Sequence, residues 1–151
     1  MMETRIDQML RSMTLAEKVS MVAGANLWHS TGVQRLEIPA FKMTDGPNGA
    51  RGEARSDLTS VCLPVGTALA ASWNVELINR VGQLLGEEAL SKGAQILLGP
   101  TVNIHRSPLA GRNFECYSED PYLTARMAVA FIKGVQSKGV GTALCSCAAI
   151  R

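Results

Sequence analysis

Apolar residues recur at helical spacing in two segments near the start of the chain. The first segment, residues 5–12, predicts a short amphipathic helix. The second begins at Thr14, whose hydroxyl can cap a helix while Glu17, three residues later, completes a capping box. Because Gly24 is typical of a helix end, we expect this second helix to run to about Val22.

Two longer helices are predicted further along the chain. Asn74 is a good N-terminal cap for a helix over residues 75–91, and Gly93 would end it. A second pattern predicts a helix over residues 122–137, which Gly139 would end. The apolar stripes that define these helices are Val75, Ile78, Val81, Leu85 and Ala89 in the first and Leu123, Met127, Ala130, Phe131 and Gly134 in the second.

Short apolar runs alternate with these helices and read as strands. They are expected at residues 41–44, 67–71, 94–98 and 140–145. Strands that alternate with helices predict an α/β architecture with parallel strands and crossover helices. A long polar segment, residues 99–121, follows one strand. In α/β barrels the active site lies where the strands end, so this segment and Asp45 could converge on one pocket.

Composition and charge mainly exclude classes of protein, such as nucleic-acid-binding and membrane-spanning proteins. The 15 basic residues are scattered among 13 acidic ones and aromatic residues make up 5%, which argues against a nucleic-acid partner. No apolar run approaches the roughly 20 residues of a membrane span. The first residues lack the apolar centre of a signal peptide, so we expect a cytoplasmic protein. Its cysteines would then be free thiols: Cys62, Cys116, Cys145 and Cys147.

Asp45 is the first candidate for chemistry. It stands at a predicted strand end, directly before Gly46-Pro47. A carboxylate there can accept hydrogen bonds from two hydroxyl groups, which suits sugar recognition. The alternative is a turn-capping role, because turn geometry alone favours Asp before Gly-Pro. The residue pattern leaves both interpretations open.

Three arginines, Arg51, Arg106 and Arg112, belong to the same inferred edge of the sheet. A guanidinium offers five donors in a rigid fork and can hold carboxylates or sugar hydroxyls. Alternatively, these arginines pair with acidic residues of the long polar segment and brace it. The acidic residues available for such pairs are Glu115, Glu119 and Asp120.

Other polar residues carry weaker signals. His29 and His105 have no second histidine or cysteine at ligand spacing, so no metal site is expected, and solvent-facing or loop-bracing roles suit them. The pair Glu87-Glu88 reads as a solvated helix face. No glycine-rich phosphate loop or nucleophile elbow is present, so neither nucleotide binding nor serine hydrolysis is supported.

Two stretches of the sequence have an unusual composition. The first is residues 44–51, Thr-Asp-Gly-Pro-Asn-Gly-Ala-Arg, and the second is residues 98–121, which contains Gly-Arg-Asn-Phe-Glu and Ser-Glu-Asp-Pro. Both resemble glycoside hydrolase family 3, especially its β-glucosidase branch. Residues 13–19 and 71–74 also fit, so the resemblance extends from about Ile6 to Leu144. It implies a single partial domain over 1–151: an incomplete TIM-type (β/α) barrel, roughly its first half.

The resemblance also implies roles for individual residues. Asp45 matches the family aspartate that hydrogen-bonds the sugar in subsite −1, and Arg112 matches an arginine that reaches the same sugar. Arg51 matches a further arginine near the pocket. The ligand would be a β-glucoside or oligosaccharide, and no cofactor is implied. By this resemblance all three are substrate-binding residues, and none is catalytic.

The sequence departs from the family at its end. Where the family has a strand ending in Lys-His-Phe, this chain has Cys145-Ser146-Cys147, and residues 145–151 no longer follow the pattern. The abrupt change suggests a frameshift or a truncated reading frame. The family's nucleophilic aspartate and acid/base glutamate belong to later segments that do not occur in these 151 residues. Retaining hydrolysis needs both carboxyl groups, about 5 Å apart.

We therefore expect a fragment of a retaining β-glucosidase-like enzyme. Its parent would hydrolyse terminal β-D-glucosyl units, while the chain alone would supply part of the sugar-binding subsite and be inactive. The alternative is a non-catalytic carbohydrate-binding module, or a half-barrel that complements a partner. An incomplete barrel exposes strand edges, which would favour association.

Overall fold

The computed structural model describes residues 2–52 and 59–145. The chain divides into two compact units, and the boundary along the sequence lies between Met43 and Thr44. The expectation of one partial domain over the whole chain stays a prediction. The departure at residues 146–151 lies outside the described residues.

The first unit contains helices α1 (Met2–Ser12) and α2 (Leu15–Ala23) and a short 3-10 turn, η1 (Gln34–Leu36). The predicted capping box is present, because the Thr14 hydroxyl accepts the Glu17 N–H at 3.2 Å and the Glu17 carboxylate accepts the Thr14 N–H at 2.8 Å. Gly24 ends α2 with a φ of 77°, a conformation that glycine adopts without strain. Both predicted helices are thus confirmed.

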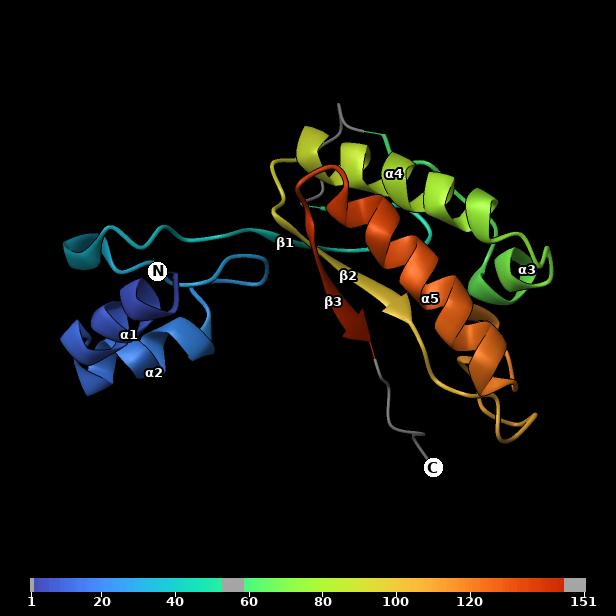
Figure 1. Ribbon diagram of the computed structural model, residues 1–151, viewed down its shortest axis with the longest axis horizontal. Helices are drawn as coiled ribbons and strands as arrows, with labels where there is room; N and C mark the ends of the chain where they lie inside the picture. Colours follow the sequence, from blue (N-terminus) through green and yellow to red (C-terminus); the bar gives the residue numbers. More distant parts are fainter. Residues whose placement is uncertain (1, 53–58, 146–151) are drawn as a thin grey trace. The chain divides into compact units, whose positions relative to one another are not determined.

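The second unit is a three-stranded sheet covered by helices (Figure 1). The strands are β1 (Met43–Asp45), β2 (Ile96–Thr101) and β3 (Gly141–Cys145), in the order β1-β2-β3. β1 begins at the boundary between the units and places Thr44 and Asp45 in the second. β2 and β3 are parallel, with Leu97 opposite Thr142. The predicted α/β architecture with parallel strands is confirmed.

Helices α4 (Val75–Ser91) and α5 (Pro121–Gln136) lie side by side against the sheet (Figure 1). The predicted cap Asn74 is present, because its side chain accepts the Leu77 N–H at 2.8 Å. The structure adds a cap for α5, where the Asp120 side chain accepts the Tyr122 N–H at 2.9 Å. No helix of the described residues is long and apolar enough to cross a membrane.

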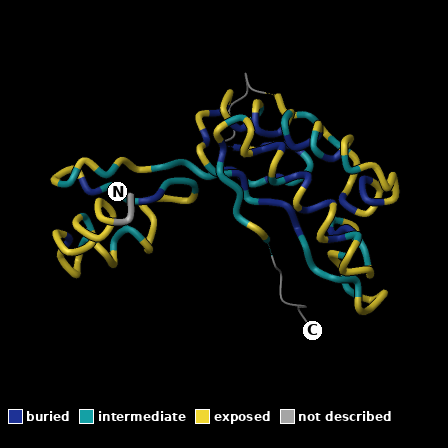
Figure 2. Tube along the Cα trace, viewed as in Figure 1, coloured by how far each residue is buried: buried dark blue, intermediate teal, exposed yellow. Residues whose placement is uncertain are grey.

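The core of the second unit lies where α4 and α5 pack on β2, and buried positions concentrate there (Figure 2). The helices approach closely at Gly82 and Gly134. A Cβ atom on Gly134 would lie 2.2 Å from the Asn79 carbonyl oxygen, so only glycine permits this packing. The largest apolar side chains of the core are Ile78, Leu85, Leu97, Met127, Phe131, Val135 and Val140.

One predicted strand is wrong. Residues 67–71 were expected in a strand, but they belong to a short helix, α3 (Gly66–Ala70), and its C-cap. The segment Ala68-Leu69-Ala70-Ala71 is rich in alanine, the strongest helix former, and carries no β-branched residue. Helical spacing buries Gly66, Leu69 and Ala70 on one side. Local propensity and tertiary packing therefore agree on a helix.

Candidate functional site

Asp45 is the last residue of β1, and hydrogen bonds of the neighbouring backbone fix its position. The preceding Thr44 is fully buried, and its hydroxyl oxygen accepts the Gly52 N–H at 2.6 Å. The Asp45 carbonyl oxygen accepts the Arg51 N–H at 2.8 Å. Among the described residues, no hydrogen bond reaches the half-buried Asp45 carboxylate. Its oxygens can therefore accept hydrogen bonds from a ligand.

The chain turns sharply after Asp45, as the Gly-Pro sequence predicts. Gly46 has a φ of 130°, and a Cβ atom there would lie 1.7 Å from the Gly49 carbonyl oxygen. The turn leaves the Arg51 side chain exposed. A position for Arg51 near the sugar stays a prediction.

Arg112 belongs to the irregular segment after β2 and is half-exposed, with 53% of its side chain accessible. Its Nε donates to the Glu115 carboxylate. The other Glu115 oxygen accepts the hydroxyl of Thr101, the last residue of β2, at 3.4 Å. The ion pair that the loop-bracing interpretation of Arg112 expects is therefore present. Sugar contact by the same guanidinium stays a prediction.

Helix α3 holds this segment in place. The Thr67 hydroxyl lies 3.2 Å from the Asn113 carbonyl oxygen, 3.2 Å from that of Phe114 and 2.9 Å from that of Cys116. A Cβ atom on Gly66 would lie 2.3 Å from the Glu115 carbonyl oxygen. Because residues 67–71 were predicted as a strand, the sequence analysis missed this contact between α3 and the segment after β2. The alanine-rich sequence after Gly66 indicates a helix and could have revealed it.

The two loops leave the same edge of the sheet. β1 and β2 are neighbours, they run in the same direction (Figure 1), and each ends directly before its loop. Asp45 is the terminal residue of β1, and Thr101, which contacts the Arg112 partner Glu115, is the terminal residue of β2. The structure thus brings the Asp45 and Arg112 loops to the carboxyl ends of adjacent strands.

Within residues 2–52 and 59–145, histidines and cysteines define no second site. His105 lies in the segment after β2, where its Nε2 atom is buried without a hydrogen-bond partner among the described residues. His29 lies 3.0 Å from the Asn26 side-chain oxygen. The residues that the structure describes contain no group of three side chains able to hold a metal ion. Cys62 is exposed, Cys116 is buried and Cys145 is half-buried. That the four cysteines stay reduced remains a prediction.

Burial dominates the one strong pKa shift in this unit. Tyr117, two residues beyond Glu115, is 4% exposed, and desolvation raises the pKa of its phenol well above its usual range. The phenol is therefore neutral at physiological pH.

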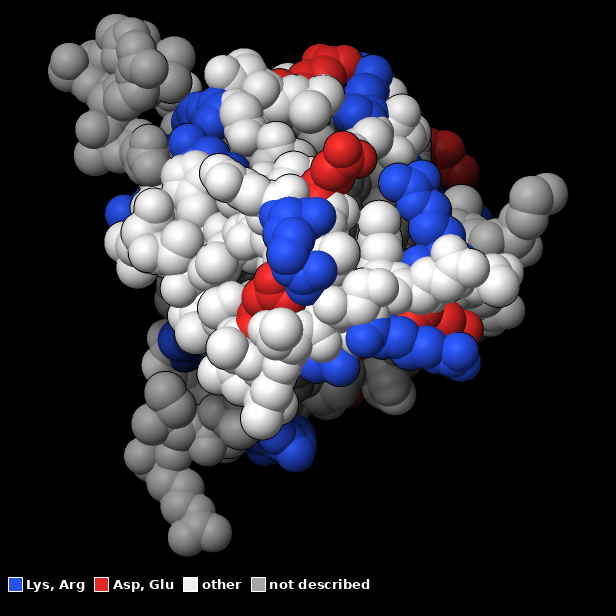
Figure 3. Space-filling model, turned by 90° about the vertical axis from the view of Figure 1, so that its left-hand side faces the viewer, with Lys and Arg blue, Asp and Glu red and all other residues white. Residues whose placement is uncertain are grey.

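On the face drawn in Figure 3, basic and acidic side chains are interspersed, in line with their scatter along the sequence. The absence of a nucleic-acid partner stays a prediction.

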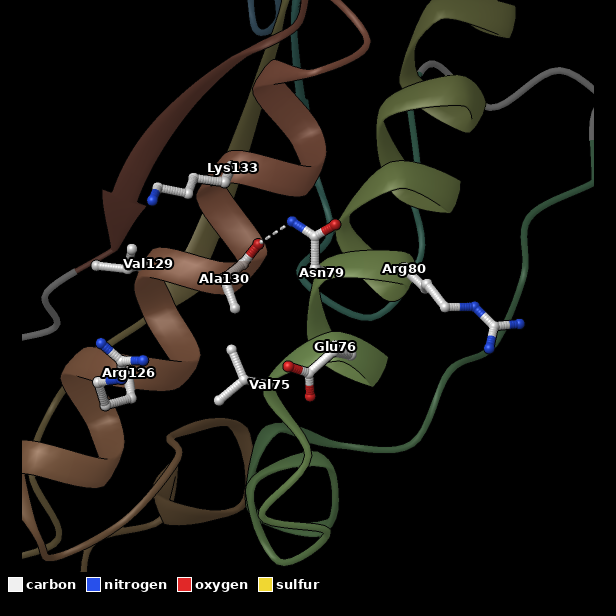
Figure 4. A pocket seen from close by; sticks show the side chains of 8 residues that line it. All are labelled: Val75, Glu76, Asn79, Arg80, Arg126, Val129, Ala130 and Lys133. Atoms are coloured by element: carbon white, nitrogen blue, oxygen red, sulfur yellow. Dashed lines mark hydrogen bonds between the residues drawn. The ribbon is translucent and has the colours of Figure 1, made fainter.

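A hollow of about 380 Å³ between α4 and α5 is unrelated to the predicted site (Figure 4). None of Asp45, Arg51 and Arg112 lines it. Asn79 links the two helices there by donating to the Ala130 carbonyl oxygen at 3.0 Å. Figure 4 shows Arg80 and Lys133 pointing away from one another, so their charges do not converge on a common ligand position.

The fold and these loops place the chain in a known family. The Glycosyl hydrolase family 3 N terminal domain matches residues 6–145, and the chain belongs to this family. It is 57% identical over 141 residues to a beta-glucosidase of Rhizobium radiobacter. It is 46% identical over 151 residues to thermostable beta-glucosidase B of Acetivibrio thermocellus.

These matches cover 92% and 95% of this chain but only 17% and 20% of the two relatives. The chain therefore spans about a fifth of their length.

Solved structures agree. Beta-glucosidase 3B of Thermotoga neapolitana in complex with glucose matches with a TM-score of 0.84 and 40% identity, over 93% of this chain and 22% of that one. A beta-glucosidase of Kluyveromyces marxianus in complex with glucose matches with a TM-score of 0.88 and 39% identity, over 93% and 17%. The described fold is thus an incomplete TIM-type barrel, as predicted.

Proposed function

We propose that this chain forms part of a glucose-binding subsite, subsite −1, of a family 3 β-glucosidase-like enzyme. Asp45 would accept hydrogen bonds from sugar hydroxyls, and Arg112 would donate to the same sugar. The observation that carries the proposal is that their loops follow the ends of neighbouring strands while the Asp45 carboxylate has no partner among the described residues. Arg51 is the third proposed substrate contact.

The parent reaction is the retaining hydrolysis of a terminal β-D-glucosyl unit. That reaction needs a nucleophilic carboxylate and an acid/base carboxyl group about 5 Å apart. Family resemblance places both in segments beyond the part that this chain matches. We therefore propose that the 151 residues recognise the sugar, need no cofactor and turn over no substrate alone.

Calorimetry with glucose tests the binding role. The unmodified chain should bind glucose, and Asp45→Ala should bind it much more weakly, because the acceptor oxygens are removed. Asp7→Ala, an exposed carboxylate on α1, is the matched control and should bind like the unmodified chain. Absence of binding by the unmodified chain, or equal affinity in Asp45→Ala, would contradict the proposal.

A second candidate function is a half-barrel that complements a partner chain. β3 is the last strand of the described sheet, and its Leu144 is 57% exposed. An open strand edge with an apolar side chain favours pairing with another strand. In size-exclusion chromatography the chain should associate, and Leu144→Lys should shift it towards the monomer. A folded monomer at all concentrations argues against this function.

We also propose a cytoplasmic location. The support is that the exposed Cys62 is a free thiol, as expected in a reducing compartment. Cell fractionation with an antibody against the chain would test it, and recovery outside the cytoplasm would refute it.

A further inference from the structure

The last turns of α4 carry a carboxylate that reaches the loop after β1. The Glu88 Oε2 atom accepts the Ala50 N–H at 2.6 Å, and its Oε1 atom accepts the Val61 N–H at 2.6 Å. Ala50 and Val61 stand eleven positions apart, so one carboxylate joins both arms of this loop. Because the acceptor is ionised, these hydrogen bonds are stronger than those between neutral groups.

Lys92, the residue that caps the C-terminus of α4, reaches the same loop. It is 7% exposed, and Nζ donates to the Ala50 carbonyl oxygen and to the Ser60 hydroxyl. The Ser60 hydroxyl in turn donates to the Ala50 carbonyl oxygen at 2.8 Å. Both backbone groups of the fully buried Ala50 are therefore held by α4 side chains.

The residue after Ala50 hydrogen-bonds the candidate sugar-binding residue, Asp45. The next residue, Arg51, donates its N–H to the Asp45 carbonyl oxygen at 2.8 Å. Gly52 then donates to the Thr44 hydroxyl at 2.6 Å. A helix that fixes Ala50 thus fixes the short loop that closes on Thr44 and Asp45.

The expectation of a solvated face for Glu87-Glu88 is correct for one member only. Glu87 is exposed and pairs with Lys138 at 2.7 Å, whereas Glu88 is half-buried and binds the loop. Helical spacing carries the signal: Glu88 follows Leu85 by three positions and Val81 by seven, so it lies on the flank of the buried stripe.

We propose that Glu88 is a positioning residue that sets the orientation of the Asp45 carboxylate for sugar binding. It acts through the Ala50 and Val61 amides, with Lys92 as its second anchor. This inference rests on the proposed function of Asp45. It assigns to α4 a specific role in the sugar site, beyond its part in the core.

Glu88→Gln is the sharpest variant because it preserves the size of the side chain. A glutamine oxygen can accept one of the two N–H groups, but its NH₂ group then faces the other donor. Glu87→Gln makes the same change one residue earlier, in a side chain that does not contact the loop. The two variants have equal charge, and Glu87→Gln loses the surface pair with Lys138 in place of the loop contact.

The experiment follows the NMR signals of the Ala50 and Val61 amides, the Asp45 ¹³Cγ signal and the affinity for glucose. Glu88→Gln should shift all three NMR signals, speed exchange of both amides and weaken glucose binding by about tenfold, the effect of one charge-assisted hydrogen bond. Glu87→Gln should leave them unchanged. In an Asp45→Asn background, Glu88→Gln should weaken binding less than twofold further, because the effect passes through Asp45.

The outcomes separate the two claims. If the unmodified chain does not bind glucose, the proposed function fails, and the Asp45 ¹³Cγ and amide signals still decide whether Glu88 positions the loop. Unchanged signals in Glu88→Gln, or equal affinity losses with and without Asp45→Asn, overturn the inference. If Glu88→Gln does not fold, Ser60→Ala, which removes a single hydroxyl from the same contacts, should shift the same signals by a smaller amount.

Discussion

The loops after β1 and β2 carry the two proposed sugar contacts but are held in different ways. The β1 loop is anchored to α4 through Glu88 and Lys92, which bind its backbone and leave the Asp45 carboxylate available. The β2 loop is anchored to α3 through backbone carbonyl groups, and its Arg112 side chain is already paired with Glu115. An acceptor is thus presented ready for a ligand, whereas the donor must share its charge with a neighbouring carboxylate.

The largest effect predicted from this comparison is on sugar affinity. Asp45→Ala should reduce glucose affinity by about ten- to a hundredfold, the effect of one or two hydrogen bonds to a charged group. Because no hydrogen bond reaches this carboxylate among the described residues, the free energy of unfolding should change by less than about 0.5 kcal/mol. Urea unfolding measures the stability, and a loss above about 1.5 kcal/mol would show that Asp45 caps the turn instead.

The anchoring of the β2 loop can be broken at α3. Gly66→Ala should destabilise the protein by about 1–3 kcal/mol, because the added Cβ would lie 2.3 Å from the Glu115 carbonyl oxygen. Gly111→Ala, where no atom lies within 4 Å of the added Cβ, is the matched control and should be neutral. Thermal unfolding compares them, and equal melting temperatures would contradict the close packing of this loop on α3.

A smaller effect should follow from the Thr67 hydroxyl. Thr67→Val should cost about 1 kcal/mol, because the carbonyl groups of the β2 loop lose their shared donor. Thr67→Ser retains the hydroxyl and should keep most of the stability. If Thr67→Ser loses stability in urea unfolding and Thr67→Val does not, the methyl group and not the hydrogen bond supports the loop.

The smallest predicted effect is on the pKa of Glu17 in the first unit, and it should leave both loops unchanged. The Arg35 side chain hydrogen-bonds Glu17 at 2.8 Å and, with the Thr14 backbone N–H, lowers the pKa of Glu17 from 4.5 to about 2. A lowered acid pKa stabilises the folded state above pH 4.5, and that contribution is lost as the pH falls towards 2.

Arg35→Gln should raise the pKa of Glu17 towards 4.5, as measured from its carboxyl ¹³C signal. The Asp45 signals should be the same in this variant and the unmodified chain at neutral pH. An unchanged pKa of Glu17 would contradict the assigned cause.

Much of the fold could be predicted because its signals are local. The caps Thr14 and Asn74 fix where two helices begin, and the apolar stripe that contains Phe131 fixes which face is buried. The apolar run at 41–44 and the Gly46-Pro47 turn place Asp45 at a strand end, where it lies. These features depend on neighbouring residues, so one sequence suffices to read them.

The rest depends on contacts between distant residues. Glu88 looks like half of a solvated acidic pair until the loop near Ala50 is folded against it, 38 positions earlier in the chain. Residues 67–71 were too short for a periodic pattern to separate helix from strand. Glu115 was one of several acidic partners that the sequence left open for Arg112, and only the folded segment selects it.

The proposed site requires Asp45 and Arg112 to contact the same sugar. A glucose titration can follow the Asp45 ¹³Cγ signal and the Arg112 Nε–Hε signal in one sample. If both residues contact the bound sugar, both signals should move along saturating curves with one common Kd. Movement of only one signal, or two different Kd values, would show that the two residues share no ligand.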